Sequence, residues 1–369
     1  CSPVAGLFAA LVAFGYALGG VAAQGRVAAA VPGATVAVAA LAPVGLLAIV
    51  FPEGGTEPFP FLTLLPILVV AAVALATTPR TATTLRAGVV VYAVASVVVY
   101  LVPSAIGSNI ARLGTLLAAP LAALVWWRRQ TLLLAIAALP LLYIGWQAPV
   151  HDVTLLAGDP STHAGYYRPL LRFLRLQSPR AGPFRLEIPF TRSHWEAYRV
   201  APYFPIARGW ERQLDVADNA VFYRGHLTAT AYESWLHRNA IRYVAVPDVA
   251  LDASARAEAA LVRRGVPYLR LVMRSVHWRV YAVADPTPLA GGVARATAIG
   301  TDWVELHARS PGIAIVRVRF TPYWAIGEGA GCVMPNGAET RLVLRRAGGV
   351  RLVTRFSLAR IQARSPRCT

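Results

Sequence analysis

Four side chains that can exchange protons or bind cations lie close together in the sequence, just after its last long apolar run. They are His151, Asp152, Asp159 and His163. Carboxylates and imidazoles act as acid and base, and they also hold divalent cations such as Mg or Mn. The predicted catalytic residues are Asp152, Asp159 and His163, and Tyr167 and Arg168 follow as predicted substrate-binding residues. The alternative is local structure, since Asp159-Pro-Ser-Thr also fits a turn that begins a helix.

A second cluster combines aromatic rings with carboxylates and arginines. Its two segments are Arg192–Glu196 and Trp210–Asp215. Aromatic faces stack on sugar rings, and carboxylates accept hydrogen bonds from hydroxyl groups. The predicted substrate-binding residues in these segments are Trp195, Glu196, Trp210, Glu211 and Arg212. The same residue types also fit interior salt bridges around a buried tryptophan, so both interpretations stay open.

The loop Ser104–Arg112 is the third candidate. Gly107, Ser108 and Asn109 stand before an apolar run, where they can cap a helix. Backbone amides at the start of a helix can bind an anion. We therefore count Asn109 and Arg112 among the substrate-binding candidates, with a simple helix cap as the alternative.

The three cysteines are Cys1, Cys332 and Cys368. We expect Cys332 and Cys368 to form a disulfide in an oxidising compartment, and two buried free thiols are the alternative. The sequence has no Cys-x-x-Cys spacing, which argues against zinc. It also lacks a phosphate-binding glycine loop, a Gly-x-Ser-x-Gly elbow and a His-Glu-x-x-His motif, and this disfavours the common nucleotide and hydrolase chemistries.

The elements that must position these residues begin with a series of apolar runs. A helix needs about 20 mainly apolar residues to cross a bilayer. Six runs meet or approach this length, and they are Val4–Ala23, Ala34–Phe51, Phe61–Thr78, Ala87–Val102, Leu113–Trp127 and Thr131–Gln147. The sequence therefore predicts a transmembrane region of about six helices over residues 1–149.

The charges of the connecting loops assign the two sides of the membrane. One set of alternate loops carries five arginines, at positions 26, 80, 86, 128 and 129, and the other set carries Glu53, Glu57 and Arg112. Positive loops stay in the cytoplasm. We therefore expect the cytoplasmic membrane to be spanned several times, with the N-terminus and the region after Pro149 on the outer side.

The part after the apolar runs has two predicted subdomains. Residues 150–288 alternate strand-like and helical segments, which favours an α/β subdomain, and they include an amphipathic helix over His163–Leu176. Residues 289–369 contain alternating strands with Gly and Pro between them, which predicts a β-sandwich. The fold class is thus an α-helical transmembrane bundle followed by an extracytoplasmic α+β domain that ends in a β-sandwich.

Charge gives a further indication of the partners. The net charge is +18, and every basic side chain is an arginine. Residues 150–369 carry thirty arginines against sixteen acidic residues. A positive domain beside a membrane attracts lipid headgroups and phosphate-bearing substrates, whereas an outward-facing domain has no reason to meet nucleic acid. The alternative is solvated arginine spread by the codon bias of a GC-rich genome.

The chain starts without Met and enters an apolar run at once. We expect it to be a C-terminal fragment of a longer protein, and a lipid-modified Cys1 is the alternative.

Four stretches of the chain together carry a resemblance to a known family: Gly107–Leu113, Asp159-Pro-Ser-Thr, Gly209–Asp215 and Thr321-Pro-Tyr-Trp. With them the chain resembles a family of uncharacterised actinobacterial polytopic membrane proteins. That family is similar in layout to membrane glycosyltransferases of the GT-C type. In those enzymes the decisive acidic residue lies in the first outer loop, which has no counterpart before the first apolar run here, so the resemblance transfers no catalytic residue.

This resemblance implies a cell-envelope glycosyltransferase that uses a polyprenyl-phosphate sugar at the outer face of the cytoplasmic membrane. A carboxylate would activate the hydroxyl of an envelope glycan acceptor, and arginines would hold the departing lipid phosphate. A non-catalytic, membrane-anchored protein that binds envelope glycan or assists its assembly is the alternative. A transporter is disfavoured, because the predicted spans contain almost no ionisable residue.

Overall fold

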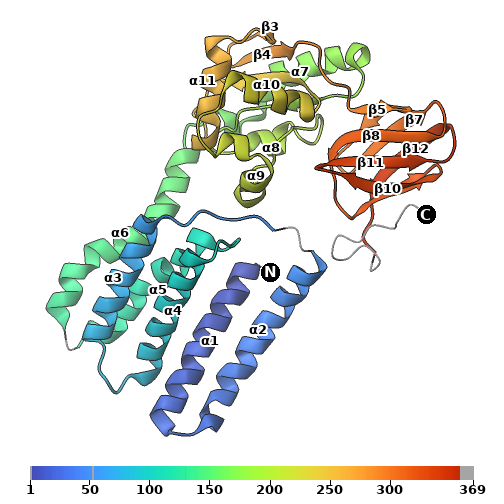
Figure 1. Cartoon of the computed structure of the whole chain (residues 1–369). Coiled ribbons are helices and arrows are strands. Elements are labelled where there is room, and N and C mark those ends of the chain that lie inside the picture. Colours follow the sequence, from blue (N-terminus) through green and yellow to red (C-terminus); the bar gives the residue numbers. More distant parts are fainter. Residues whose placement is uncertain (1, 52–53, 129, 358–369) are drawn as a thin grey trace. The chain divides into compact units, whose positions relative to one another are not determined.

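The structure is a computed structural model that describes residues 2–51, 54–128 and 130–357 (Figure 1). The chain divides into two compact units, Cys1–Thr154 and Leu155–Thr369. The first unit is helical, and the second contains three four-stranded sheets together with several helices.

Each of the six predicted apolar runs overlaps a helix, and most of these helices extend a few residues beyond the run. The helices of the first unit are α1 (Pro3–Gln24), α2 (Val31–Val50), α3 (Phe61–Thr77), α4 (Thr83–Leu101), α5 (Ala111–Trp126) and α6 (Thr131–Leu156). Among the described residues, five helical segments are long and apolar enough to cross a membrane, namely Pro3–Gln24, Val27–Val50, Thr83–Leu101, Gly107–Trp126 and Thr131–Leu156. Helix α3 is also apolar, but its 17 residues fall short of that length.

Helix α6 extends further than the sequence predicts. Its expected end was Gln147, but it continues to Leu156 with Pro140 and Pro149 inside it. A proline removes one backbone hydrogen bond and kinks a helix, yet the turns on either side can persist. Asp152 is therefore an exposed helical residue and does not belong to an outer loop.

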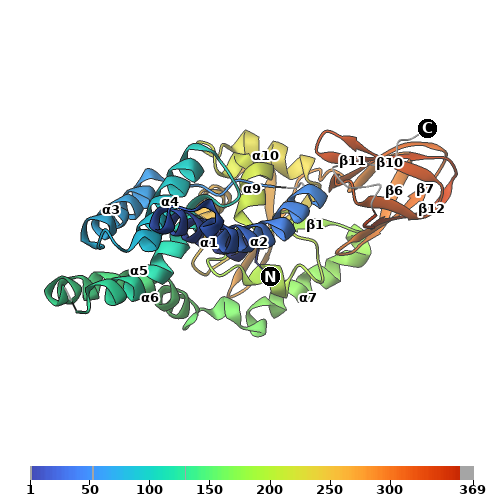
Figure 2. The ribbon, with the colours of Figure 1, turned by 90° about the horizontal axis from the view of Figure 1, so that it is seen from below.

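Small residues bring the helices of the first unit close together. Helix α1 lies between α2 and α4 (Figures 1 and 2). A Cβ atom on Gly19 would lie 2.2 Å from the Cα atom of Thr84, and one on Gly33 would lie 2.5 Å from the carbonyl oxygen of Ala13. Close backbone approach at small residues is typical of helix pairs that cannot use the hydrophobic effect to associate.

The first sheet of the second unit has the strand order β1-β2-β4-β3. Its strands are β1 (Arg185–Glu187), β2 (Ile241–Pro247), β3 (Leu269–Arg274) and β4 (Trp278–Val283). Strands β1 and β2 are parallel, and the other neighbours are antiparallel. The helices of this part are α7 (Ala164–Ala181), α8 (Trp195–Arg199), α9 (Arg212–Asp218), α10 (Ala229–Arg238) and α11 (Arg256–Arg264).

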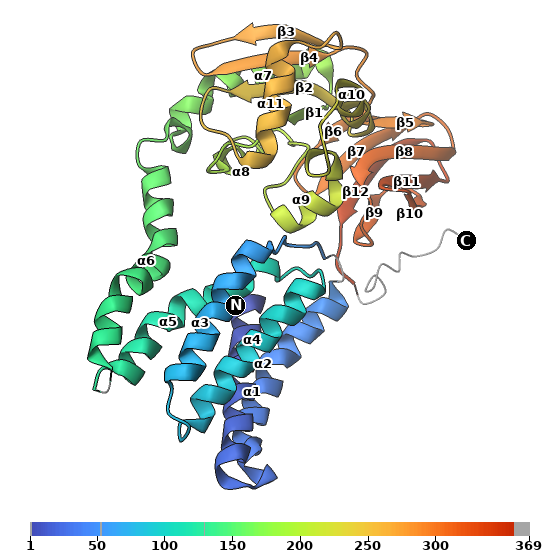
Figure 3. The ribbon, with the colours of Figure 1, turned by 60° about the vertical axis from the view of Figure 1, so that its left-hand side comes forward.

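Both faces of this sheet are covered by helices (Figure 3). Successive side chains of a strand point to opposite faces. In β2, Val244 packs with the buried residues of α10 and α11, whereas Tyr243 and Ala245 pack with those of α7. Trp278 in β4 is buried on the α7 side, and its Nε1 donates a hydrogen bond to the carbonyl oxygen of Tyr166 over 2.8 Å.

The remaining strands form two antiparallel sheets with the orders β10-β11-β8-β5 and β6-β7-β12-β9. The strands are β5 (Ala290–Gly292), β6 (Ala294–Ile299), β7 (Trp303–Ala308), β8 (Gly312–Arg319), β9 (Trp324–Glu328), β10 (Gly331–Asn336), β11 (Glu339–Leu344) and β12 (Gly348–Thr354). Both sheets contribute to one hydrophobic cluster, for example through Leu306 and Leu352 from one sheet and Val316 and Leu342 from the other. This shared core explains the alternating burial along β7 and β11.

Candidate functional site

The three predicted catalytic residues have different surroundings. Asp152 and His163 are exposed. Asp159 caps the 3-10 turn Pro160–Thr162: its Oδ1 accepts from the backbone N–H of Ser161 over 2.8 Å, and its Oδ2 accepts from the hydroxyl of Ser193 over 2.7 Å. No group of three or more His, Cys, Asp or Glu side chains in the described part of the chain can hold a metal ion. Asp159 thus performs the structural role that its turn motif allows.

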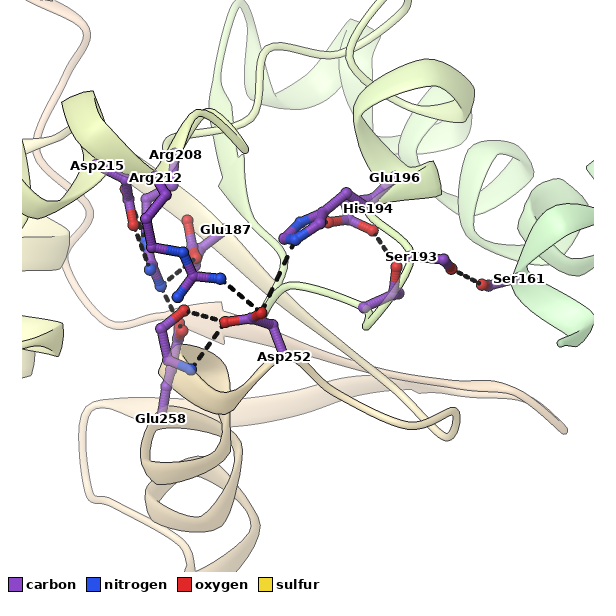
Figure 4. Close-up of polar contacts among 12 residues, drawn as sticks. Ser161, Glu187, Ser193, His194, Glu196, Arg208, Arg212, Asp215, Asp252 and Glu258 are labelled. Atoms are coloured by element: carbon purple, nitrogen blue, oxygen red, sulfur yellow. Dashed lines mark hydrogen bonds and ion pairs between the residues drawn. The ribbon is translucent and has the colours of Figure 1, made fainter. Parts of the chain in front are cut away.

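The two predicted aromatic segments do meet, and they meet at Asp252, which the sequence did not single out (Figure 4). The Nη2 atom of Arg212 lies 2.8 Å from Oδ2 of Asp252, and Nε2 of His194 lies 3.9 Å from the same oxygen. Nδ1 of His194 also lies 3.5 Å from Oε1 of the buried Glu196. Burial opposes ionisation of Asp252, but hydrogen bonds from Ser254 and Arg212 outweigh it and lower the pKa of this carboxyl.

His194 has an unusual backbone conformation. Its φ angle is 56°, in the left-handed region that residues other than glycine seldom adopt. Such strain collects at positions that the surrounding structure overdetermines, often at functional sites. The backbone N–H of His194 donates to the carbonyl oxygen of Thr191, and the N–H of Arg192 donates to the carbonyl oxygen of Ala250. These two hydrogen bonds stabilise the turn Thr191–His194.

A separate ionic cluster is fully enclosed. Arg208 lies between the rings of Phe190 and Phe222, 4.2 and 3.8 Å from their centroids. Its guanidinium contacts three buried carboxylates, those of Glu187, Asp215 and Glu258. These side chains are no more than 1 % exposed, so a solvent-borne ligand does not reach them in this conformation. We assign this cluster to the stability of the fold.

The pKa values in the enclosed cluster follow from its burial. Burial raises the pKa of Glu187 well above its ordinary value, and the charge of Glu258 adds to this rise. Burial also raises the pKa of Glu258 to about 7, although Arg208 opposes the change. For Arg208 burial alone would lower the pKa, but the hydrogen bonds to Asp215 and the charges of Glu187 and Glu258 raise it. Arg208 therefore stays charged, while the pKa values of Glu187 and Glu258 are both raised by burial.

A large groove lies beside α8. It has a volume of about 800 Å³ and lies between α7 and the segment that begins with α8. Its lining residues are Ala164, Tyr167, Arg168, Leu171, Arg172, Arg175, Leu176, Tyr198, Arg199, Pro202 and Tyr203. Four of these are arginines and three are tyrosines, and no acidic side chain is among the described residues that line it.

Helical spacing explains how the arginines come to the groove. Side chains three and four residues apart share one face of a helix. Arg168, Arg172 and Arg175 follow this spacing on α7, while Leu170 and Leu174 face the core and are fully buried. Arg199 enters from α8, where its Nη2 donates to the carbonyl oxygen of Thr162 over 2.8 Å.

The groove contains two of the predicted substrate-binding residues, Tyr167 and Arg168. Trp195 lies under the guanidinium of Arg199, whose Cζ is 5.3 Å from its ring centroid. Trp210 and Glu211 are exposed outside the groove, and Arg212 pairs with Asp252. Arg172, Arg175 and Arg199 line the same groove but were not among the predicted substrate-binding residues, although the arginine spacing within the predicted amphipathic helix indicated a shared face for Arg172 and Arg175.

Asn109 and Arg112 lie in the first unit. Asn109 belongs to the 3-10 turn Gly107–Ile110 before α5, and its backbone N–H donates to the carbonyl oxygen of Ile106. Gly107 has a φ angle of 41°, and a Cβ atom there would lie 2.1 Å from the carbonyl oxygen of Glu57. The conformation of this turn therefore requires glycine, which accords with a helix start and leaves anion binding at Asn109 as a prediction.

The predicted disulfide lies partly beyond the described residues. Cys332 in β10 is disulfide-bonded. Cys368, its predicted partner, lies outside the described residues, as does Cys1. The pairing of Cys332 with Cys368 therefore stays a prediction.

Comparison with known proteins gives no match: no family model, no curated protein and no solved structure matches this chain.

Proposed function

We propose that this chain is a multi-pass membrane protein of the cell envelope and that its second unit, outside the cytoplasmic membrane, binds envelope glycan or assists its assembly. The observation that carries the membrane setting is the set of five long apolar helices. Their exposed side chains include Phe14, Leu46 and Leu139. Apolar surface of this extent is unfavourable in water and suits a bilayer.

Two observations support the outer location of the second unit. Arg26 lies between α1 and α2, Arg80 lies between α3 and α4 with Arg86 in the first turn of α4, and Arg128 follows α5, so these arginines mark alternate ends of the helices, where the positive-inside rule favours the cytoplasm. The disulfide at Cys332 suits an oxidising compartment.

The geometry favours binding over catalysis. Of the predicted catalytic residues, Asp152 and His163 are exposed and Asp159 is hydrogen-bonded in a turn, and the described lining of the groove is basic and aromatic. Exposed rings are available for stacking on sugars: Tyr198 is 66 %, Tyr203 61 % and Trp210 58 % exposed. Exposed rings of this size are typical of ligand-binding surfaces.

The fold proposal includes a β-sandwich at the end of the second unit. Its support is the single hydrophobic cluster to which both C-terminal sheets contribute. Two antiparallel sheets that bury their inner faces together form such a sandwich.

A GT-C-like glycosyltransferase that uses a polyprenyl-phosphate sugar is the second candidate. The observation in its favour is the imidazole of His194 between the carboxylates of Glu196 and Asp252, at a strained and partly exposed turn. An imidazole held in this way can accept a proton from an acceptor hydroxyl. No metal-binding group supports it among the residues that the structure describes.

Topology is the first test. A reporter that is active only outside the cytoplasm, fused to the C-terminal end of the full chain, is expected to be active. A reporter inserted at Arg80, between α3 and α4, is expected to be inactive. The reverse pattern would reject the outer location.

The second test separates binding from transfer. Mass spectrometry compares polyprenyl-linked sugars and envelope glycans between a strain that lacks the gene and its parent. Unchanged lipid-linked sugars, together with binding of the purified full chain to isolated envelope glycan, support the binding protein. Accumulation of one lipid-linked sugar and loss of that sugar from the polymer would replace this proposal with the transferase, and replacement of His194 by Ala would then abolish the transfer.

A further inference from the structure

The groove between α7 and α8 contains four arginines that form no ion pair with a carboxylate among the described residues. Arg168 and Arg172 are four residues apart on α7, and Arg175 follows one turn later. Like charges at this spacing repel one another and destabilise a helix slightly. None of the ion pairs found among the described residues involves these three arginines or Arg199. An anion in the groove would relieve the repulsion.

Arg199 has donor capacity left over. One of its Nη atoms bonds to Thr162, and its guanidinium stacks 5.0 Å from the ring centroid of Tyr198. Its Nε atom is buried and has no hydrogen-bond partner among the described residues. A buried donor without a partner is costly, so the protein groups around Arg199 do not use its full hydrogen-bonding capacity.

Tyr167 lines the groove, but its side chain is fully buried and its hydroxyl has no hydrogen-bond partner among the described residues. Burial raises the pKa of this hydroxyl, and the charges of Glu196 and Asp159 raise it further. Tyr167 therefore keeps its proton at any physiological pH.

The rest of the groove is apolar and open to solvent. Leu171 and Pro202 line it, and Leu176 beside them is 66 % exposed. Arg175 lies over the ring of Tyr203, with its Cζ 5.4 Å from the centroid, so that the ring is held in place. A charged part and an apolar part in one cavity suit a ligand with the same two parts.

We propose that this groove binds a phosphate group attached to an apolar chain, with the phosphate at Arg168, Arg172, Arg175 and Arg199 and the chain along Leu171 and Leu176. Guanidinium groups bind phosphate through paired charge-assisted hydrogen bonds. The volume of about 800 Å³ lies within the usual range for small-ligand sites. The inference rests on the proposed function for its source of lipid, since a membrane-anchored unit meets such molecules at once.

The test uses the full chain in nanodiscs of neutral phosphatidylcholine and isothermal titration calorimetry. The probes are inorganic phosphate, dihexanoyl phosphatidic acid, farnesyl phosphate and, as the uncharged control, dihexanoylglycerol. We expect both lipid phosphates to bind more tightly than inorganic phosphate, and dihexanoylglycerol not to bind. Tighter binding of phosphatidic acid identifies a bilayer phospholipid as the ligand, and tighter binding of farnesyl phosphate identifies a polyprenyl lipid.

The variant for this test is R172Q/R175Q, which changes two exposed side chains and should leave the fold intact. The loss of two charge-assisted contacts is expected to weaken the binding of both lipid phosphates by roughly tenfold or more. The matched control is R270Q/R274Q, which removes two exposed arginines of β3. Binding that is absent in the parent protein, or weakened equally by both double variants, would overturn the inference. The reporter experiment is independent: an inner location of the second unit rejects the proposed function and leaves binding in the groove untouched.

Discussion

Arg208 and Asp215 form a two-point ion pair inside the second unit. Nε of Arg208 lies 3.2 Å from Oδ1 of Asp215, and Nη2 lies 2.7 Å from Oδ2. The pair is enclosed by two aromatic rings, and Tyr223 donates a further hydrogen bond to Oδ2. It joins the segment between α8 and α9 to α9 itself, and this segment also pairs with β1 through the bridge between Ile206 and Leu186.

Replacement of Arg208 by Met is expected to destabilise the second unit by about 3–5 kcal/mol, because three buried carboxylates lose their common cation. Arg208→Lys should also destabilise it, since an ammonium group cannot reproduce the two-point geometry. Chemical denaturation followed by tryptophan fluorescence measures the change. Arg270→Gln is the control at an exposed position, and an R208M protein as stable as this control would show that the cluster contributes little.

The carboxyl of Glu187 predicts a pH dependence of stability. Burial, followed by the charge of Glu258, raises the pKa of Glu187 in the folded protein above its value in the unfolded chain. The unfolded chain therefore releases this proton at lower pH than the folded protein, and the free energy of unfolding falls as the pH rises through the folded pKa. The stability is complete below the ordinary pKa of glutamate, and Glu258, with a pKa of about 7, extends the loss towards neutral pH.

Thermal melting of the full chain between pH 5 and pH 8.5 measures this effect. We expect the melting temperature to decrease with increasing pH and the decrease to become smaller in Glu187→Gln, because the amide carries no charge at any pH. Glu328→Gln changes an exposed carboxylate and should keep the slope of the parent protein. An unchanged slope in the Glu187 variant would place the titration elsewhere.

Gly19 tests the packing of α1 against α4. Gly19→Ala places a Cβ atom 2.2 Å from the Cα atom of Thr84, and this contact requires the helices to move apart. We expect a clearly lower melting temperature in detergent. Gly45→Ala in α2 is the matched control, because nothing lies within 4 Å of its new Cβ atom and alanine favours helix. Equal melting temperatures of the two variants would contradict the close approach.

The disulfide of Cys332 gives a prediction for peptide mapping. Mass spectrometry of the unreduced protein should find Cys332 linked to Cys368, and Cys332→Ser should lower stability by roughly 3–4 kcal/mol on the chain-entropy account. The control is the same variant measured under reducing conditions, where it should match the reduced parent protein. A link from Cys332 to Cys1 would reject the predicted pairing.

The helices of the first unit could be predicted because their signal is local. A run such as Phe61–Thr77 is apolar at nearly every position, and no partner is needed to recognise it. The end of α6 was wrong because Pro149 reads as a stop signal, whereas the helix accommodates it. In the C-terminal part the alternation is clear only for β7, β8, β11 and β12, whereas β5 has three residues, two of them glycines, and β10 contains a proline, so neither shows a clear pattern.

The site was predicted less well than the fold, because its residues become neighbours only through long-range pairing. Arg192–Glu196 and Trp210–Asp215 were correctly grouped, yet the residue that joins them, Asp252, comes from a turn after β2. The arginines of α7 share a helix face that the sequence does show, but Arg199 lies across the groove and its role depends on the turn that precedes α8.

The hydrogen bond from Trp278 to Tyr166 has a consequence for biosynthesis. The two residues are 112 positions apart, so a ribosome must add that many residues after Tyr166 before this bond can form. Leu170 and Leu174 can pack earlier with residues of β1 and β2, but their hydrophobic cluster is complete only after Trp278 and Val280 of β4 have been added. Incompletely covered apolar faces promote aggregation. Slow translation between β2 and β4 would therefore prolong the interval in which this cluster is incomplete.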